Sequence, residues 1–154
     1  MTRLLGIGSP FGADRLAWEA VDHLAESGLG ECELVKLDRP GSGLLSWFDG
    51  VEHLILLDAL AHDSDAGRPR LLNPDELQRL STGTSSHGFG VAQALDLAAQ
   101  LDQLPPRVDI VGIATGADLS KLPGLDTQAL ESLIRSLLVP DRCGKPHPTS
   151  LNSA

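Results

Sequence analysis

Short aliphatic runs alternate with longer amphipathic stretches along most of this chain. Each run is flanked by polar or turn-forming residues, which is typical of strands that are buried on both faces. The runs predict strands at residues 3–7, 33–38, 53–57, 67–72 and 108–114. The run at 53–57 is the strongest, with Asp58 at its C-terminal end, whereas 67–72 is expected to be an edge strand.

Apolar residues recur at helical spacing between the predicted strands. After Asp14, the side chains of Ala17, Val21 and Leu24 fall on one face of a helix, and Gly28 is expected to end it. Further helices are predicted at 44–48, at 74–80, in a long segment opened by His87, and in a final segment capped by Asp126 or Thr127 and ended by Pro140.

This alternation of strand and helix predicts the fold class. Right-handed βαβ crossovers give an α/β three-layer sandwich, with a mainly parallel sheet of about five strands and helices on both faces. We expect residues 1–140 to form a single domain. Residues 141–154 are rich in Pro, Ser and Asn and have almost nothing to bury, so a flexible C-terminal tail is expected there.

Composition narrows the classes of partner. The 154 residues are 42% hydrophobic and 21% charged, which is enough apolar surface for a folded core. A net charge of −9, with two Trp, three Phe and no Tyr, argues against a nucleic-acid partner. The longest apolar stretch, 54–61, is far shorter than the ~20 residues that cross a bilayer. With two cysteines and no leader-like segment, a cytoplasmic location is expected.

Four polar residues are predicted to meet at the edge formed by the carboxyl ends of the strands, where ligands bind in such sheets. They are Asp14 after the first strand, Asp38 at the end of the second, Asp58 at the end of the central strand, and His87 at the start of a helix. Asp14 could be only a helix cap and Asp38 only a turn residue. Asp58 ends four aliphatic residues, where a carboxylate is poorly solvated unless it has a partner or a function.

The position of His87 favours a neutral ring, because the positive end of a helix dipole disfavours imidazolium. One imidazole and two carboxylates form a ligand set that zinc or nickel accepts. His87 could instead be only a surface helix cap. The other histidines, including His53, are assigned to surface or loop roles.

The glycine-rich loop at 6–12 does not fit a nucleotide site. Its third glycine comes one residue late for a dinucleotide motif, and Pro10 removes a backbone donor. Asp14 would also place a carboxylate where a pyrophosphate should lie.

Five blocks of sequence resemble the maturation endopeptidases of nickel-iron hydrogenases. They occur in the family's order over about residues 4–138 and comprise 6–14, Asp38 with 41–43, 54–59, 85–90 and 111–113. The resemblance implies a hydrogenase-maturation-protease-like domain at 1–140. It places the family's three metal-contacting positions at Asp14, Asp58 and His87.

The resemblance also implies a function. Such an enzyme removes the C-terminal extension of a hydrogenase large subunit after nickel insertion, and its three metal-contacting residues recognise nickel that the substrate's thiolates already hold. No tightly bound cofactor is then expected, although zinc or cadmium could act as surrogates for nickel. Asp38 is the candidate for orienting or activating water. The expected partner is the large-subunit precursor, with no nucleic acid or membrane, and a monomer is expected.

Several positions depart from the family's usual residues. Ser9 replaces Asn, Ala13 replaces an acid, Arg15 replaces a glycine, and Ala114 replaces another acid. Arg15 could lower metal affinity because it adds positive charge beside a ligand. Two alternatives therefore remain at this point: a nickel-sensing or scaffold protein that binds the immature subunit without cutting it, and an unrelated metal hydrolase on the same fold.

Overall fold

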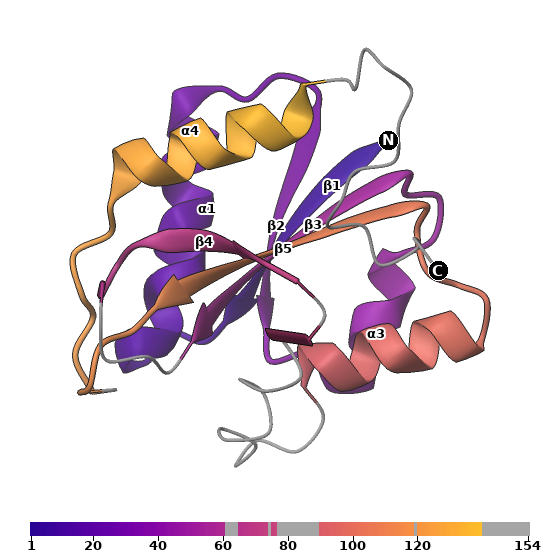
Figure 1. Ribbon diagram of the computed structural model, residues 1–154, viewed down its shortest axis with the longest axis horizontal. Coiled ribbons are helices and arrows are strands. Elements are labelled where there is room, and N and C mark those ends of the chain that lie inside the picture. Colours follow the sequence, from indigo (N-terminus) through magenta and orange to yellow (C-terminus); the bar gives the residue numbers. More distant parts are fainter. Residues whose placement is uncertain (61–64, 74, 77–89, 119, 140–154) are drawn as a thin grey trace.

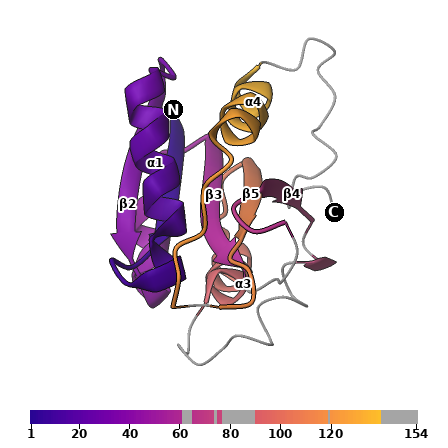
Figure 2. The ribbon, with the colours of Figure 1, turned by 90° about the vertical axis from the view of Figure 1, so that its left-hand side faces the viewer.

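Five strands form one twisted sheet at the centre of the computed structural model (Figure 1). The structure describes residues 1–60, 65–73, 75–76, 90–118 and 120–139. The strands are β1 (Thr2–Gly8), β2 (Cys32–Asp38), β3 (His53–Leu60), β4 (Pro69–Leu72) and β5 (Arg107–Ala114). Their order is β2-β1-β3-β5-β4, and Figure 2 shows β2, β3, β5 and β4 following one another from left to right. Only β4 runs antiparallel to its neighbour, so the predicted mainly parallel α/β sheet is confirmed.

Helices cover both faces of the sheet. They are the α-helices α1 (Leu16–Ser27), α3 (Val91–Gln100) and α4 (Thr127–Leu138), and the 3₁₀ helices η1 (Gly12–Arg15) and η2 (Gly41–Trp47). The α1 and α4 helices pack on one face, while η2 and α3 pack on the other (Figure 1). No helix in the described part of the chain is long and apolar enough to cross a membrane.

The two halves of the core meet in β3, whose residues 54–57 are fully buried. Leu54 and Leu56 pack against the layer of η2 and α3, whereas Ile55 and Leu57 pack against α1 and α4. Because successive side chains of a strand point to opposite faces, an unbroken aliphatic run suits a strand that is covered on both sides.

The structure corrects the predicted end of the central strand. β3 continues through Ala59 to Leu60, so Asp58 lies inside the strand and not at its end. The reason is the pairing with β5, whose residues up to Ala114 stay in register with β3 up to Leu60. Backbone pairing thus continues past Asp58, the residue at which the sequence pattern predicted the end of the strand.

The start of α3 also differs from the prediction. The helix begins at Val91 and not at His87, with Gly90 as its N-cap. The Gly90 N–H donates to Oε1 of Gln93 at 3.0 Å, which fixes this first turn. His87 itself lies outside the described residues, as do most of the predicted helix at 74–80 and the predicted tail at 141–154.

Candidate functional site

Three of the four predicted site residues lie at the carboxyl ends of neighbouring parallel strands. Asp14 is in η1, directly after β1, Asp38 is the last residue of β2, and Asp58 is near the end of β3. Asp58 pairs in register with Ile7 of β1, which places it beside the loop that carries Asp14. His87, the fourth predicted residue, lies outside the described part of the chain.

A tight loop fixes the position of Asp14. The Ser9 N–H donates to the Asp14 carbonyl oxygen at 3.2 Å, and the Ser9 hydroxyl donates to Oδ2 of Asp14 at 3.3 Å. A Cβ atom on Gly8 would overlap that same carbonyl oxygen, so the close approach of β1 to η1 requires glycine at this position. Ser9 is therefore a buried support for the carboxylate and not a simple turn residue.

The surroundings of Asp58 raise its pKa. The pKa of Asp58 is raised to about 7, and burial is the main cause; the backbone hydrogen bond from Ala59 opposes the rise, and the charge of Asp14 adds to it. No described Lys, Arg or His side chain forms an ion pair with Asp58. The site thus holds two neighbouring carboxylates without a compensating cation from the described residues.

Two carboxylates are an incomplete set of metal ligands. Within the described residues, no group of three or more His, Cys, Asp or Glu side chains is placed to hold a metal ion. The Asp14–Asp58 pair can supply oxygen ligands to a divalent cation, but the cation would need further ligands from elsewhere.

Asp38 has different surroundings from the other two aspartates. Its carboxylate is more than half exposed, and its Oδ1 lies 3.3 Å from Nε of Arg39. The Arg39 N–H donates to the Gly8 carbonyl oxygen at 3.0 Å, which ties the end of β2 to the loop that carries Asp14. Asp38 is therefore held at the same edge of the sheet, in contact with solvent.

The side chain of Arg15, at the end of η1, is paired with a residue of α1. Its Nη2 lies 2.6 Å from Oε1 of Glu19, one turn further along the chain. This ion pair partly neutralises the guanidinium that the sequence analysis placed beside the metal-contacting position.

A second charged cluster, which the sequence analysis missed, lies at the opposite edge of the sheet. The carboxylate of Asp109 is fully buried, with its Oδ2 at 2.7 Å from Nε2 of His53 and 3.0 Å from Nε of Arg107. The assignment of His53 to a surface or loop role was wrong: it begins β3 and is almost fully buried. An Asp inside an aliphatic strand segment was the signal that a buried partner must exist.

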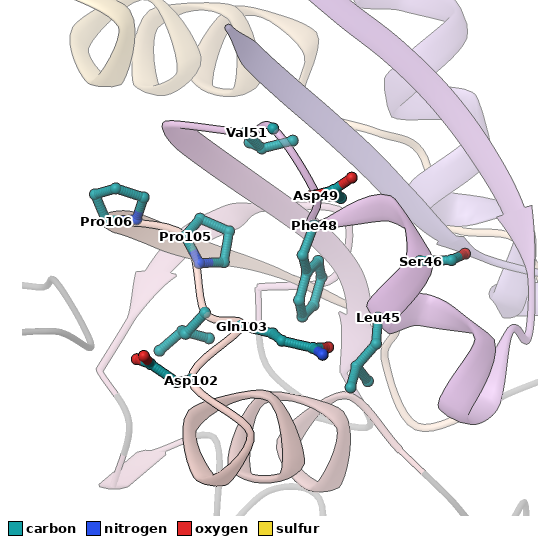
Figure 3. A pocket seen from close by; sticks show the side chains of 11 residues that line it. Leu45, Ser46, Phe48, Asp49, Val51, Asp102, Gln103, Pro105 and Pro106 are labelled. Atoms are coloured by element: carbon teal, nitrogen blue, oxygen red, sulfur yellow. The ribbon is translucent and has the colours of Figure 1, made fainter.

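A pocket of about 470 Å³ also opens at this opposite edge, between η2 and the segment that leads from α3 into β5 (Figure 3). Phe48 and Val51 line it just before β3, and Pro105 and Pro106 line it just before β5. Because these residues precede the strands, the pocket is not part of the site at the carboxyl ends.

Comparison with known proteins identifies a family. The sequence matches the hydrogenase maturation protease family over residues 30–130, which is more than half of the chain and includes Asp38, Asp58 and His87. Asp14 precedes the matched region. No curated protein matches the sequence.

Solved structures share the fold. The hydrogenase maturating endopeptidase HybD from Escherichia coli is 23% identical, with a TM-score of 0.65 and 90% of each chain covered. An endopeptidase from Escherichia coli is also 23% identical, with a TM-score of 0.66 and 90% of each chain covered. The [NiFe] hydrogenase maturation protease HybD from Thermococcus kodakarensis is 20% identical, with a TM-score of 0.60, 89% of this chain and 96% of that chain covered.

Proposed function

Because this chain belongs to the hydrogenase maturation protease family, we propose that it removes the C-terminal extension of a nickel-iron hydrogenase large subunit once nickel has been inserted. Membership of the family makes the chain a maturation endopeptidase that acts on a large-subunit precursor. The proposal adds the timing of the cut and the residues that sense it.

Asp14, Asp58 and His87 are proposed to recognise nickel that is bound to the precursor. This proposal is supported by the position of Asp14 and Asp58 at the carboxyl ends of neighbouring strands, where the charge of Asp14 adds to the raised pKa of Asp58. Two neighbouring carboxylates bind a divalent cation favourably, because the cation replaces their mutual repulsion with attraction. The precursor's thiolates would supply the ligands that the two aspartates lack, and His87 would add an imidazole.

Such recognition makes cleavage conditional on nickel insertion. Without nickel, the precursor would bring no positive charge to Asp14 and Asp58, and its thiolates would add negative charge to a site that already repels it. With nickel, the same groups become ligands of one ion. The metal therefore belongs to the substrate, and zinc or cadmium could replace it as a surrogate.

Asp38 is proposed to orient the water that attacks the peptide bond. It lies at the same edge of the sheet, is exposed to solvent and is fixed by the backbone of Arg39 against the loop that carries Asp14. A carboxylate that contacts both solvent and a docked peptide can hold water by accepting a hydrogen bond from it. The extension leaves with a new amino terminus, and the proton that this amine takes up comes from the attacking water.

The proposal is tested by incubating purified variants with the nickel-loaded precursor and following release of the extension by mass spectrometry. Asp14→Asn, Asp58→Asn and His87→Gln are expected to lower the cleavage rate at least a hundredfold, since each removes a ligand. Asp49→Asn, at an exposed aspartate near the opposite edge, is the control and should cleave like the wild type. Equal rates for Asp58→Asn and the wild type would contradict the proposed recognition, and binding without any cleavage by the wild type would favour the scaffold alternative.

A further inference from the structure

The loop between β1 and η1 presents an aromatic side chain to solvent beside the candidate site. Phe11 is 71% exposed, more than any other large hydrophobic residue in the described part of the chain. It stands three residues before Asp14 in the sequence. Single exposed apolar side chains are common on protein surfaces, so it is the position of Phe11 beside Asp14, and not its exposure alone, that points to a contact with another molecule.

The backbone of Phe11 is hydrogen-bonded to Ser9 and Asp14, the two residues that also bond to each other in this loop. Its N–H donates to the Ser9 hydroxyl oxygen at 3.4 Å, and its carbonyl oxygen accepts from the Asp14 N–H at 3.2 Å. Phe11 is also the N-cap residue of η1. The ring is therefore attached to a fixed loop, so burying it against a partner requires little further ordering of the backbone.

Two other residues with exposed hydrophobic side chains, Leu101 and Val139, have different surroundings. Leu101 and Val139 are the residues directly after α3 and α4, where helices end and apolar side chains are often left uncovered. Neither follows the carboxyl end of a strand. Leu101 is thus a suitable control for Phe11, since it is 52% exposed and remote in sequence from the aspartates.

The charge around Phe11 limits what can bind there. Asp14, Asp38 and Asp58 lie at this edge, and the whole chain carries a net charge of −9. Arg15 and Arg39 lie beside them but are already paired with Glu19 and Asp38. An acidic side chain of a substrate would be repelled, whereas an apolar side chain can cover the ring without an electrostatic cost.

We propose that Phe11 is a docking residue for the precursor, and that it takes up an apolar side chain within a few residues of the bond that is cut. This inference rests on the proposed function and adds a specificity contact to it. Aromatic side chains that become fully buried are typical hot spots of protein interfaces. Because Phe11 supplies no group to the reacting atoms, its contact affects binding of the precursor and not the chemical step, and the loss should appear in KM and not in kcat.

The test measures both the affinity of the nickel-loaded precursor, by calorimetry, and the kinetics of its cleavage. Phe11→Ala is expected to weaken binding and raise KM about tenfold, with kcat and the melting temperature unchanged. Phe11→Tyr keeps the ring and should stay within about twofold of the wild type. Leu101→Ala removes a similarly exposed apolar side chain and should change neither quantity.

Precursor variants identify the occupant. Each apolar residue next to the cut is replaced by Ser, one at a time. At one position, the replacement should weaken binding of the precursor to the wild-type protein. The same replacement should not weaken binding to Phe11→Ala any further, as is expected for two residues in direct contact. Unchanged affinity in Phe11→Ala, or strictly additive effects at every position, overturns the docking role. Failure of the wild type to cut would instead contradict the proposed function, and the affinity measurement would still decide on Phe11.

Discussion

At the scale of single residues, Asp58 has the most unusual environment in the described site. It combines burial inside a parallel sheet with a second carboxylate nearby, and both raise its pKa. A residue that served only stability would not need a charge at this position. The fold therefore bears a cost at Asp58, which is typical of residues retained for binding or catalysis.

This cost predicts how stability depends on pH. The folded-state pKa of Asp58, about 7, lies above its ordinary value of 3.8, so the native state binds more protons than the unfolded state between these values. The free energy of unfolding should therefore fall as pH rises from about 4 to about 7, and the loss should be complete above 7. Asp58→Asn carries no charge, so at pH 8 it should be more stable than the wild type by about 1–4 kcal/mol.

Urea denaturation at pH 4 and at pH 8 measures this difference. The gain should be present at pH 8 and absent at pH 4, and Asp49→Asn should show no such pH-dependent gain. A stability gain of Asp58→Asn that is the same at both pH values would contradict the account of Asp58.

At the scale of elements, the site depends on how closely β1 approaches η1. Gly8 permits this approach, because any larger residue would overlap the Asp14 carbonyl oxygen. The hydrogen bonds from Ser9 then hold the carboxylate in place. One backbone contact thus couples the end of a strand to the position of a proposed ligand.

Gly8→Ala is expected to displace Asp14 and to reduce cleavage of the nickel-loaded precursor at least tenfold, with a loss of about 1–3 kcal/mol in the free energy of unfolding from the forced overlap. Gly43→Ala is the matched control, because a Cβ there meets no atom within 4 Å. Cleavage rates and thermal melting of the two variants check this. Equal cleavage by both would mean that the loop geometry does not matter for the reaction.

The sequence pattern predicted the elements better than their ends. Aliphatic runs such as 54–57 reveal buried strands because burial on both faces leaves few other residue types. The end of β3 was wrong because pairing with β5 is set by a distant segment and continues past Asp58. The cluster of His53, Arg107 and Asp109 was missed for a related reason, since its partners come from two strands and have no local spacing.

The candidate site was predictable in part. The rule that ligands bind at the carboxyl ends of parallel strands correctly placed Asp14, Asp38 and Asp58 at one edge. The aliphatic run before Asp58 also indicated a poorly solvated carboxylate, in agreement with its raised pKa. The exposure of Asp38 could not be predicted in the same way, because it depends on how neighbouring loops cover the strand end. Metal contact by Asp14, Asp58 and His87 stays a prediction.

At the scale of the whole molecule, the sheet separates two kinds of charged group. The aspartates of the candidate site lie at the carboxyl ends of the strands, and among them only Asp38 has a cationic partner in the described part of the chain. Asp109, with its two basic partners, lies at the opposite ends of the strands. The first arrangement suits a group that must receive a cation, and the second suits a group that joins two strands.

An incomplete site predicts the metal content of the purified protein. Two aspartates, with or without His87, bind a divalent ion weakly when the precursor's thiolates are missing. Elemental analysis after treatment with a chelator is therefore expected to find far less than one nickel or zinc per chain. One firmly held ion per chain would favour a metal hydrolase over recognition of nickel in the substrate.

The proposed domain boundary gives a further prediction. Removing residues 141–154, which carry Leu151 as their only large apolar residue, should leave the melting temperature and the cleavage rate nearly unchanged, because so little apolar surface cannot offset the ordering of the segment. Differential scanning calorimetry and the cleavage assay test this. A drop of several degrees would place these residues in the folded domain.

The most direct test of the central claim uses the wild-type protein and one preparation of the large-subunit precursor, divided into a nickel-loaded and a nickel-free portion. Mass spectrometry then follows release of the C-terminal extension from each. The account predicts cleavage of the nickel-loaded portion only, and cleavage of the nickel-free portion after nickel has been inserted. Equally fast cleavage of both portions would contradict it, since nickel would then play no part in recognition.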